Sequence, residues 1–248
     1  MGPTQGLLAV ALAATLAATT PAAASAQNSA PGAPLGAARA AIVERTVVDS
    51  FLALVPRRSS DRIEADIEAA HAAERQATNR RSRADELRRQ TRDSLEVQEK
   101  ELDRARDAIR IARELDQSSR EEALLREARL RERYLDLLGL RVEALGQEVV
   151  TAEQQARQAR AVAQRFEVER RMAEERLEWL RLHGEAAVVT GAEERRVEQA
   201  KRLQEQLAEY FEALRDEERE TEKLAVARQE LAARQLRVLE RRRHLFED

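Results

Sequence analysis

The sequence contains no cysteine, and aromatic residues make up only 3% of its 248 residues. Without cysteine the chain has neither a disulfide framework nor a thiolate zinc site, and it offers no thiol for a lipid anchor. Glycine and proline are also scarce, at eight and five residues. A globular core built from two layers needs more large apolar residues than this composition provides. An ordinary globular fold is therefore not expected.

Charged residues are abundant, at 36% of the chain, and after residue 60 Ala, Glu, Leu, Arg and Gln dominate. This mixture is typical of long helices and coiled coils. The 43 basic and 46 acidic residues are interspersed and give a net charge of −3. No large field of one sign is expected, and no nucleic-acid partner.

A heptad stripe runs from Leu124 to Leu180. Fifteen of its seventeen positions are apolar, and a spacing of 3.5 residues keeps them on the seam of a left-handed coiled coil. The large residues expected to carry this helix seam are Leu124, Leu135, Leu138, Val142, Leu145, Val149, Phe166, Leu177 and Leu180. Small residues between them, from Ala152 to Ala163, would let two helices approach closely.

A weaker stripe runs from Ile63 to Ala112, with ten apolar positions of fifteen. Glu74, Arg81 and Arg88 interrupt its first half. We expect the stems of Arg81 and Arg88 to lie along the seam near the level of the alanines.

Two breaks divide the long helical region. Around 116–119 the stripe changes register, and Ser119 with Glu122 matches a capping box, although a continuous helix through this site stays open because neither Gly nor Pro is present. Gly184 and the Thr190–Glu193 spacing mark a second break. The sequence predicts an all-α, elongated antiparallel coiled-coil bundle of two to three long helices, at about 60–116, 119–183 and 191–247.

The N-terminal part differs in composition. Residues 1–26 have the short apolar run and the small-residue pattern Ala24-Ser25-Ala26 of a signal peptide, although no Lys or Arg precedes the run. Residues 27–36 are a flexible linker rich in Pro and Gly, and 37–55 form a short helix before Pro56. Residues 57–248 then form the helical coiled-coil domain. The candidate interaction helix carries Val47, Val48, Phe51, Leu52 and Leu54, which would pack against the bundle or against a second copy, or dock on a partner or a membrane surface.

The chemistry-bearing residues show no catalytic pattern. His71, His183 and His244 are far apart in the sequence, and none has a second His or Cys at metal-binding spacing. No phosphate-binding, hydrolase or metalloprotease motif is present. The run Arg241-Arg242-Arg243 is interpreted as basic residues at a helix end. We therefore expect no catalytic residues, no cofactor, no metal and no enzymatic activity.

These features favour an exported coiled-coil protein of the bacterial cell envelope, periplasmic or secreted after cleavage behind Ala26, with a structural, scaffolding or protein-interaction role. Its partners would be proteins bound through coiled-coil surfaces, including further copies of the chain, and the mature chain would not span a membrane. The combination of signal peptide, absent cysteine and long Arg/Glu-rich hairpins resembles, in architecture only, the Skp type of periplasmic holdase chaperone. A helical-hairpin adaptor of an envelope export system is a third hypothesis.

Overall fold

A computed structural model of the protein describes residues 58–185 and 192–246, all within one compact unit, residues 41–248. These residues form three α-helices, α2 (Ser60–Glu114), α3 (Ser118–Glu185) and α4 (Ala192–Phe246), and no strand. The all-α prediction with three long helices is confirmed, and its bounds differ from the observed ones by at most two residues. The signal peptide, the linker and the helix 37–55 lie outside the described residues.

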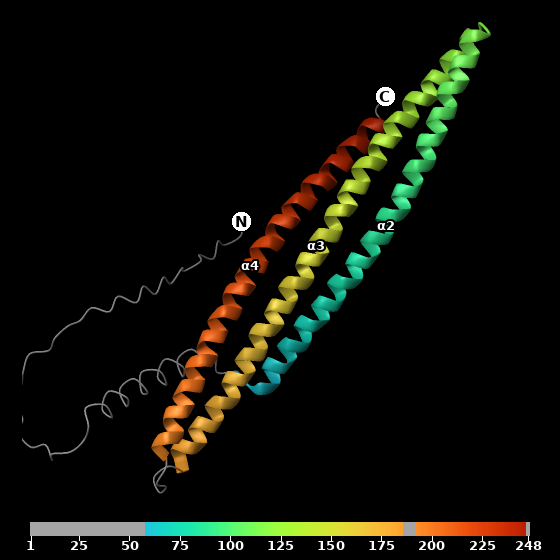
Figure 1. The fold of residues 1–248 in the computed structure, drawn as a ribbon. Helices are drawn as coiled ribbons and strands as arrows, with labels where there is room; N and C mark the ends of the chain where they lie inside the picture. Colours follow the sequence, from blue (N-terminus) through green and yellow to red (C-terminus); the bar gives the residue numbers. More distant parts are fainter. Residues whose placement is uncertain (1–57, 186–191, 247–248) are drawn as a thin grey trace, which may run out of the picture. The chain divides into compact units, whose positions relative to one another are not determined.

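Helix α3 is the partner of both other helices (Figure 1). It runs antiparallel to α2, because Arg113 pairs with Glu121 next to the turn whereas Glu74 binds Arg160 far from it. It also runs antiparallel to α4. Within the described ranges α2 and α4 hardly touch each other, so the apolar residues form two separate seams on α3 and no core is common to all three helices.

The α2–α3 seam is formed by the two heptad stripes. Ile63 and Ile67 pack on Phe166 at one end, and Leu102 and Ile109 pack on Ala128 near the turn. Alanine dominates between these clusters: Ala70, Ala77, Ala84, Ala152, Ala159 and Ala163 are all buried. Small side chains allow the two backbones to approach closely over this stretch, as the sequence indicates.

The interrupting arginines lie where the seam is polar. Arg81 stays mostly exposed and has its Nη2 atom 3.9 Å from a carboxylate oxygen of Glu153, beside the alanines. Arg88 lies further toward the turn, over Gly146 of α3. Its side chain is half-buried, which is consistent with an aliphatic stem running along the seam.

A second row on α3 forms the seam with α4. Val168 and Met172 pack on Leu203, with Trp179, Leu207 and Tyr210 around them. Further along, the row is polar. Gln147 and Thr151 are buried, and both donate hydrogen bonds to the carbonyl of Ala227, over 3.5 and 3.2 Å. Burial of these groups is tolerable because they are hydrogen-bonded.

The turn between α2 and α3 is a three-residue connection, Leu115 to Gln117. Asp116 has a φ of 53°, in the left-handed region. The amide of Gln117 donates to the carbonyl of Ala112 (2.9 Å), and the amide of Asp116 donates to the carbonyl of Arg113 (3.2 Å). These two bonds define a Schellman motif, the arrangement that satisfies the last carbonyls of a helix and reverses the chain. The chain therefore turns here, and the alternative of one continuous helix is wrong.

The predicted capping box of Ser119 and Glu122 is not the start of α3. The helix begins one residue earlier, at Ser118, and the carbonyl of Gln117 accepts from the amides of Arg120 and Glu121. The left-handed residue at 116 completes the reversal earlier than a cap at Ser119 would require. Glu121 instead pairs with Arg113 across the turn, over 2.7 Å.

Candidate functional site

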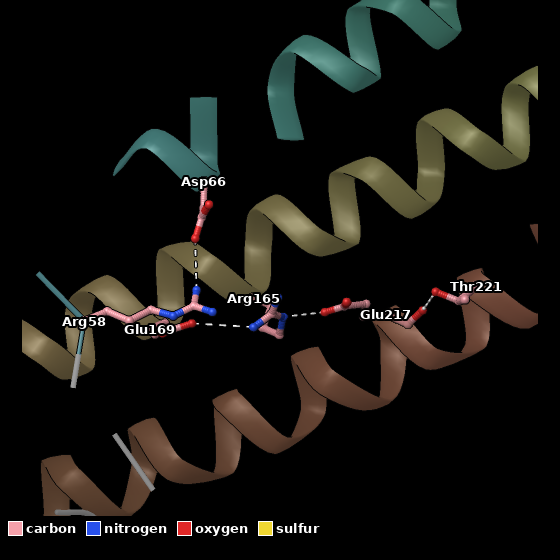
Figure 2. Close-up of polar contacts among 6 residues, drawn as sticks. All are labelled: Arg58, Asp66, Arg165, Glu169, Glu217 and Thr221. Carbon is pink, nitrogen blue, oxygen red and sulfur yellow. Dashed lines mark hydrogen bonds and ion pairs between the residues drawn. The ribbon is translucent and has the colours of Figure 1, made fainter. Parts of the chain in front are cut away.

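A buried carboxylate stands out in the α3–α4 seam. The Glu169 side chain is only 1% exposed, and its Oε2 atom lies 3.5 Å from the Nη1 atom of Arg165, one turn earlier on α3. Arg165 also donates to Glu217 of α4 (Figure 2). Glu169 Oε1 has no hydrogen-bond partner. One guanidinium group thus serves two carboxylates from two helices.

Burial weakens the preference of the Glu169 carboxyl group for its charged form. Burial raises the pKa of its carboxyl group above the ordinary value of 4.5, while the charges of Arg58 and Arg165 oppose this rise. Asp66 adds a smaller upward contribution to the pKa. Removing water from a carboxylate disfavours its charged form, and the two arginines compensate only in part.

Phe166 links this network to the start of α2. The Arg165 guanidinium lies 4.1 Å from the centroid of the Phe166 ring, and the Arg58 guanidinium lies 5.8 Å from it. Arg58 also pairs with Asp66 over 2.9 Å (Figure 2). Polar contacts and cation–π contacts therefore join the start of α2, the middle of α3 and α4 at one level. Such a network suits the setting of helix register better than it suits chemistry.

A second polar group crosses the α2–α3 seam at Glu74. Its Oε1 atom accepts two hydrogen bonds from Arg160, of 3.0 and 2.6 Å, and these bonds are the main reason why the pKa of Glu74 is lowered. His71 lies within 3.7 Å of Glu74 and 3.9 Å of Glu167. In the part of the chain that the structure describes, no three His, Asp or Glu side chains are grouped so that they could hold a metal ion.

The predicted seam residues of α3 fall into three groups. Leu138, Leu145 and Phe166 are buried, and Leu124, Leu135, Val142 and Val149 are half-buried. Leu177 and Leu180, in contrast, are 66% and 47% exposed. Helix α2 begins at Ser60, and its first apolar residues already pack on Phe166, so the described part of α2 does not reach the level of these two leucines. The structure places them at the surface and not in the seam.

Helix α4 ends well before the turn between α2 and α3. Arg241, near the end of α4, pairs with Asp136, so the first turns of α3 lie beyond it (Figure 1). The α4-facing row of α3 nevertheless continues at the same spacing, through Leu137 to Leu130. Leu130 is 57% exposed, and Ile111 and Leu115 are exposed on the same hairpin. We call the hairpin from Leu102 to Arg133 the hairpin tip.

No protein-family model, curated protein or solved structure matches the chain. None of the helical segments in the described ranges is long and apolar enough to span a membrane. The candidate interaction residues Val47, Val48, Phe51, Leu52 and Leu54 lie outside the described residues. Periodicity in the sequence indicated the seam with α2, and it did not indicate which apolar residues, such as those at the hairpin tip, stay exposed.

Proposed function

We propose that this chain is an exported, non-enzymatic coiled-coil protein of the bacterial cell envelope that scaffolds other proteins through its hairpin tip. The observation that carries the proposal is the α4-facing row of α3, which mixes apolar and polar residues and continues past the end of α4 to the exposed Leu130. A row that packs on a helix over most of its length is suited to pack on another helix at its free end. The occupant would be a helix of a partner protein or of a second copy.

The proposal is supported by the chemistry of the tip. Ile111, Leu115 and Leu130 are exposed apolar residues on a rigid two-helix element whose own seam is filled by Leu102, Ile109 and Ala128. Exposed leucines and isoleucines on a rigid element offer apolar contacts to a partner helix. The charged residues around them, such as Arg106 and Glu132, already form an ion pair with one another, over 3.0 Å.

A photo-crosslinking amino acid placed at Leu130 tests the contact in intact cells. A discrete crosslinked species is expected with the probe at Leu130 and not with the probe at Leu87, which is 45% exposed on α2 away from the tip. Light scattering coupled to size-exclusion chromatography then tells a second copy from another protein. Equal crosslinking at both positions, or none at Leu130, contradicts the tip as the contact site.

Export is tested separately, because it rests on residues 1–26 alone. We expect the chain recovered from the cell envelope to begin at Gln27 when its N-terminus is sequenced. A mature chain that still begins at Met1, recovered from the cytoplasm, contradicts the envelope location and leaves the contact at the tip as a separate question.

A holdase chaperone is the second candidate, favoured by the same exposed apolar residues. A helical arm with apolar side chains at its tip could hold an unfolded outer-membrane protein without a fixed complementary partner. The test is suppression of aggregation of a urea-denatured outer-membrane protein by the purified chain. The scaffold hypothesis predicts no suppression, whereas the holdase hypothesis predicts suppression that weakens in a variant with Ile111→Ser and Leu130→Ser.

A further inference from the structure

The last part of α4 is basic. Residues 228–246 contain six arginines and two glutamates, although the whole chain has a net charge of −3. Arg228, Arg237, Arg242 and Arg243 are all exposed. This end of α4 is therefore a positive region on a slightly acidic protein, as are residues 75–92 of α2 with seven arginines and two acidic residues, and it attracts anionic partners over about a Debye length.

The same segment carries an apolar stripe that points away from α3. Val238, Arg241 and Leu245 are half-buried on the α3 side, and Arg241 pairs with Asp136. With 3.6 residues per turn, Leu236, Leu239 and Arg243 lie on the opposite side of the helix. Leu236 and Leu239 are 56% and 60% exposed, which confirms that they face outward.

A hollow lies beside this stripe, where α4 meets α3. It has a volume of about 600 Å³ and is lined by Leu140, Arg237, Glu240, Arg241, Arg243 and His244. A smaller hollow of about 210 Å³, lined by Arg133, Arg241, His244 and Leu245, adjoins it. Arginine side chains of α3 and α4 thus line two hollows that are large enough for the phosphate-bearing headgroup of a lipid.

We propose that the C-terminal part of α4, residues 228–246, docks on the surface of a bilayer that contains anionic phospholipid. The arginines bind lipid phosphates, and Leu236 and Leu239 enter the boundary between headgroups and acyl chains. Two exposed leucines on one side of a helix, with Arg243 beside them and further arginines on the flanking sides, fit the pattern of an interfacial helix. A soluble polyanion would account for the arginines but not for the leucines. The docking is peripheral, and it does not depend on the scaffold role of the hairpin tip.

Vesicle co-sedimentation of the purified full-length chain tests the proposal. Binding is expected to vesicles in which about a third of the lipid is phosphatidylglycerol, but not to phosphatidylcholine alone. It should disappear in about 0.5 M NaCl, because salt screens the attraction between arginines and phosphates. Absence of binding to the anionic vesicles overturns the proposal.

Two variants locate the binding. The triple variant Arg237→Gln, Arg242→Gln and Arg243→Gln should weaken binding on the order of a hundredfold, at about fivefold for each arginine. Its matched control removes three exposed arginines elsewhere on α4, with Arg202→Gln, Arg215→Gln and Arg219→Gln. The control should bind as the unchanged chain does. Equal weakening in both variants would mean that only the net charge matters, which overturns the proposal.

The leucines are tested with Leu236→Ser and Leu239→Ser, against Val97→Ser and Val150→Ser, which change exposed residues on α2 and α3. Only the first pair should weaken binding, by about tenfold or more.

Unchanged binding together with tight binding of inorganic pyrophosphate would identify a soluble-anion site. If light scattering without lipid gives the leucine variant a different mass from the unchanged chain, the leucines form an interface between copies of the chain. Either result overturns the proposal, and circular dichroism confirms that each variant is folded. Leu130→Ser should leave vesicle binding unchanged, which separates this proposal from the tip contact.

Discussion

Arg88 of α2 covers Gly146 of α3. A Cβ atom built on Gly146 would lie 3.5 Å from Arg88 Nε and 3.6 Å from Arg88 Cζ, and both are ordinary contact distances. The Nε atom is buried and has no hydrogen-bond partner. A long polar side chain thus fills the space that a small residue leaves in the seam, while the rest of the seam is closed by alanine and leucine.

Gly139 and Gly146 both lie inside α3, and only Gly146 has a side chain of another helix beside it. The two positions can therefore be compared as a matched pair. Gly139 would place a Cβ atom in open space, with no other atom within 4 Å. Gly139→Ala should raise the free energy of unfolding by about 1 kcal/mol, because alanine favours the helix. Gly146→Ala should raise the free energy of unfolding by at least the same amount, since its Cβ atom would pack on Arg88 at ordinary contact distances. Thermal unfolding measures both, and a loss of stability in Gly139→Ala would contradict the packing described.

The left-handed residue in the turn gives a second prediction. Asp116 has a φ of 53°, which costs a non-glycine residue about 1 kcal/mol. Asp116→Gly should therefore stabilise the α2–α3 hairpin by up to about 1 kcal/mol, and Asp116→Val should destabilise it. Denaturant unfolding of the two variants at fixed protein concentration checks the sign. Equal stability of the glycine and valine variants would be incompatible with the Schellman motif.

The raised pKa of Glu169 predicts how the stability of the folded chain depends on pH. Burial raises its pKa in the folded chain above the ordinary value of 4.5, so the folded state holds this proton more tightly than the unfolded state. Its contribution to stability is therefore fully present below pH 4.5 and is lost as the pH rises through the folded-state pKa.

The variant Glu169→Gln removes this dependence and keeps the shape of the side chain. Relative to the unchanged chain, it should gain stability as the pH rises from about 4 to 7, because only the unchanged chain must then ionise a buried carboxyl group. Melting temperatures measured across this pH range provide the comparison. Glu222→Gln, at an exposed position of α4, is the control. A constant difference between Glu169→Gln and the unchanged chain across the range would rule out the raised pKa.

Two leucines of one stripe should respond differently to truncation. Leu145→Ala removes a buried side chain from the α2–α3 seam and should cost about 2–4 kcal/mol. Leu177→Ala changes a side chain that is 66% exposed and should stay within about 0.5 kcal/mol of the unchanged chain. Chemical denaturation of the two variants settles the comparison. A large cost at Leu177 would show that its surface is covered in solution.

The second seam of α3 shows why periodicity found only part of the packing. The row that faces α4 contains Gln147, Thr151, Arg165 and Glu169, so a search for regularly spaced apolar residues does not detect it. These polar groups are tolerated because the Ala227 carbonyl and the Glu217 carboxylate provide partners for most of them. Both acceptors lie on a helix far along the chain, so no local pattern reveals them.

The sequence by itself determined that residues 60–246 form long helices and which face of α3 packs on α2, but it left the turn at 115–117 open. These properties follow from residue spacing along a single helix, and a helix has the same period whatever surrounds it. Only the tertiary structure decided that α3 serves two partners, that Leu177 and Leu180 stay exposed, and that α4 stops before the hairpin tip. The physical reason is that burial depends on which other helix lies alongside, and helices of similar composition can pair over different lengths without a change in their own pattern.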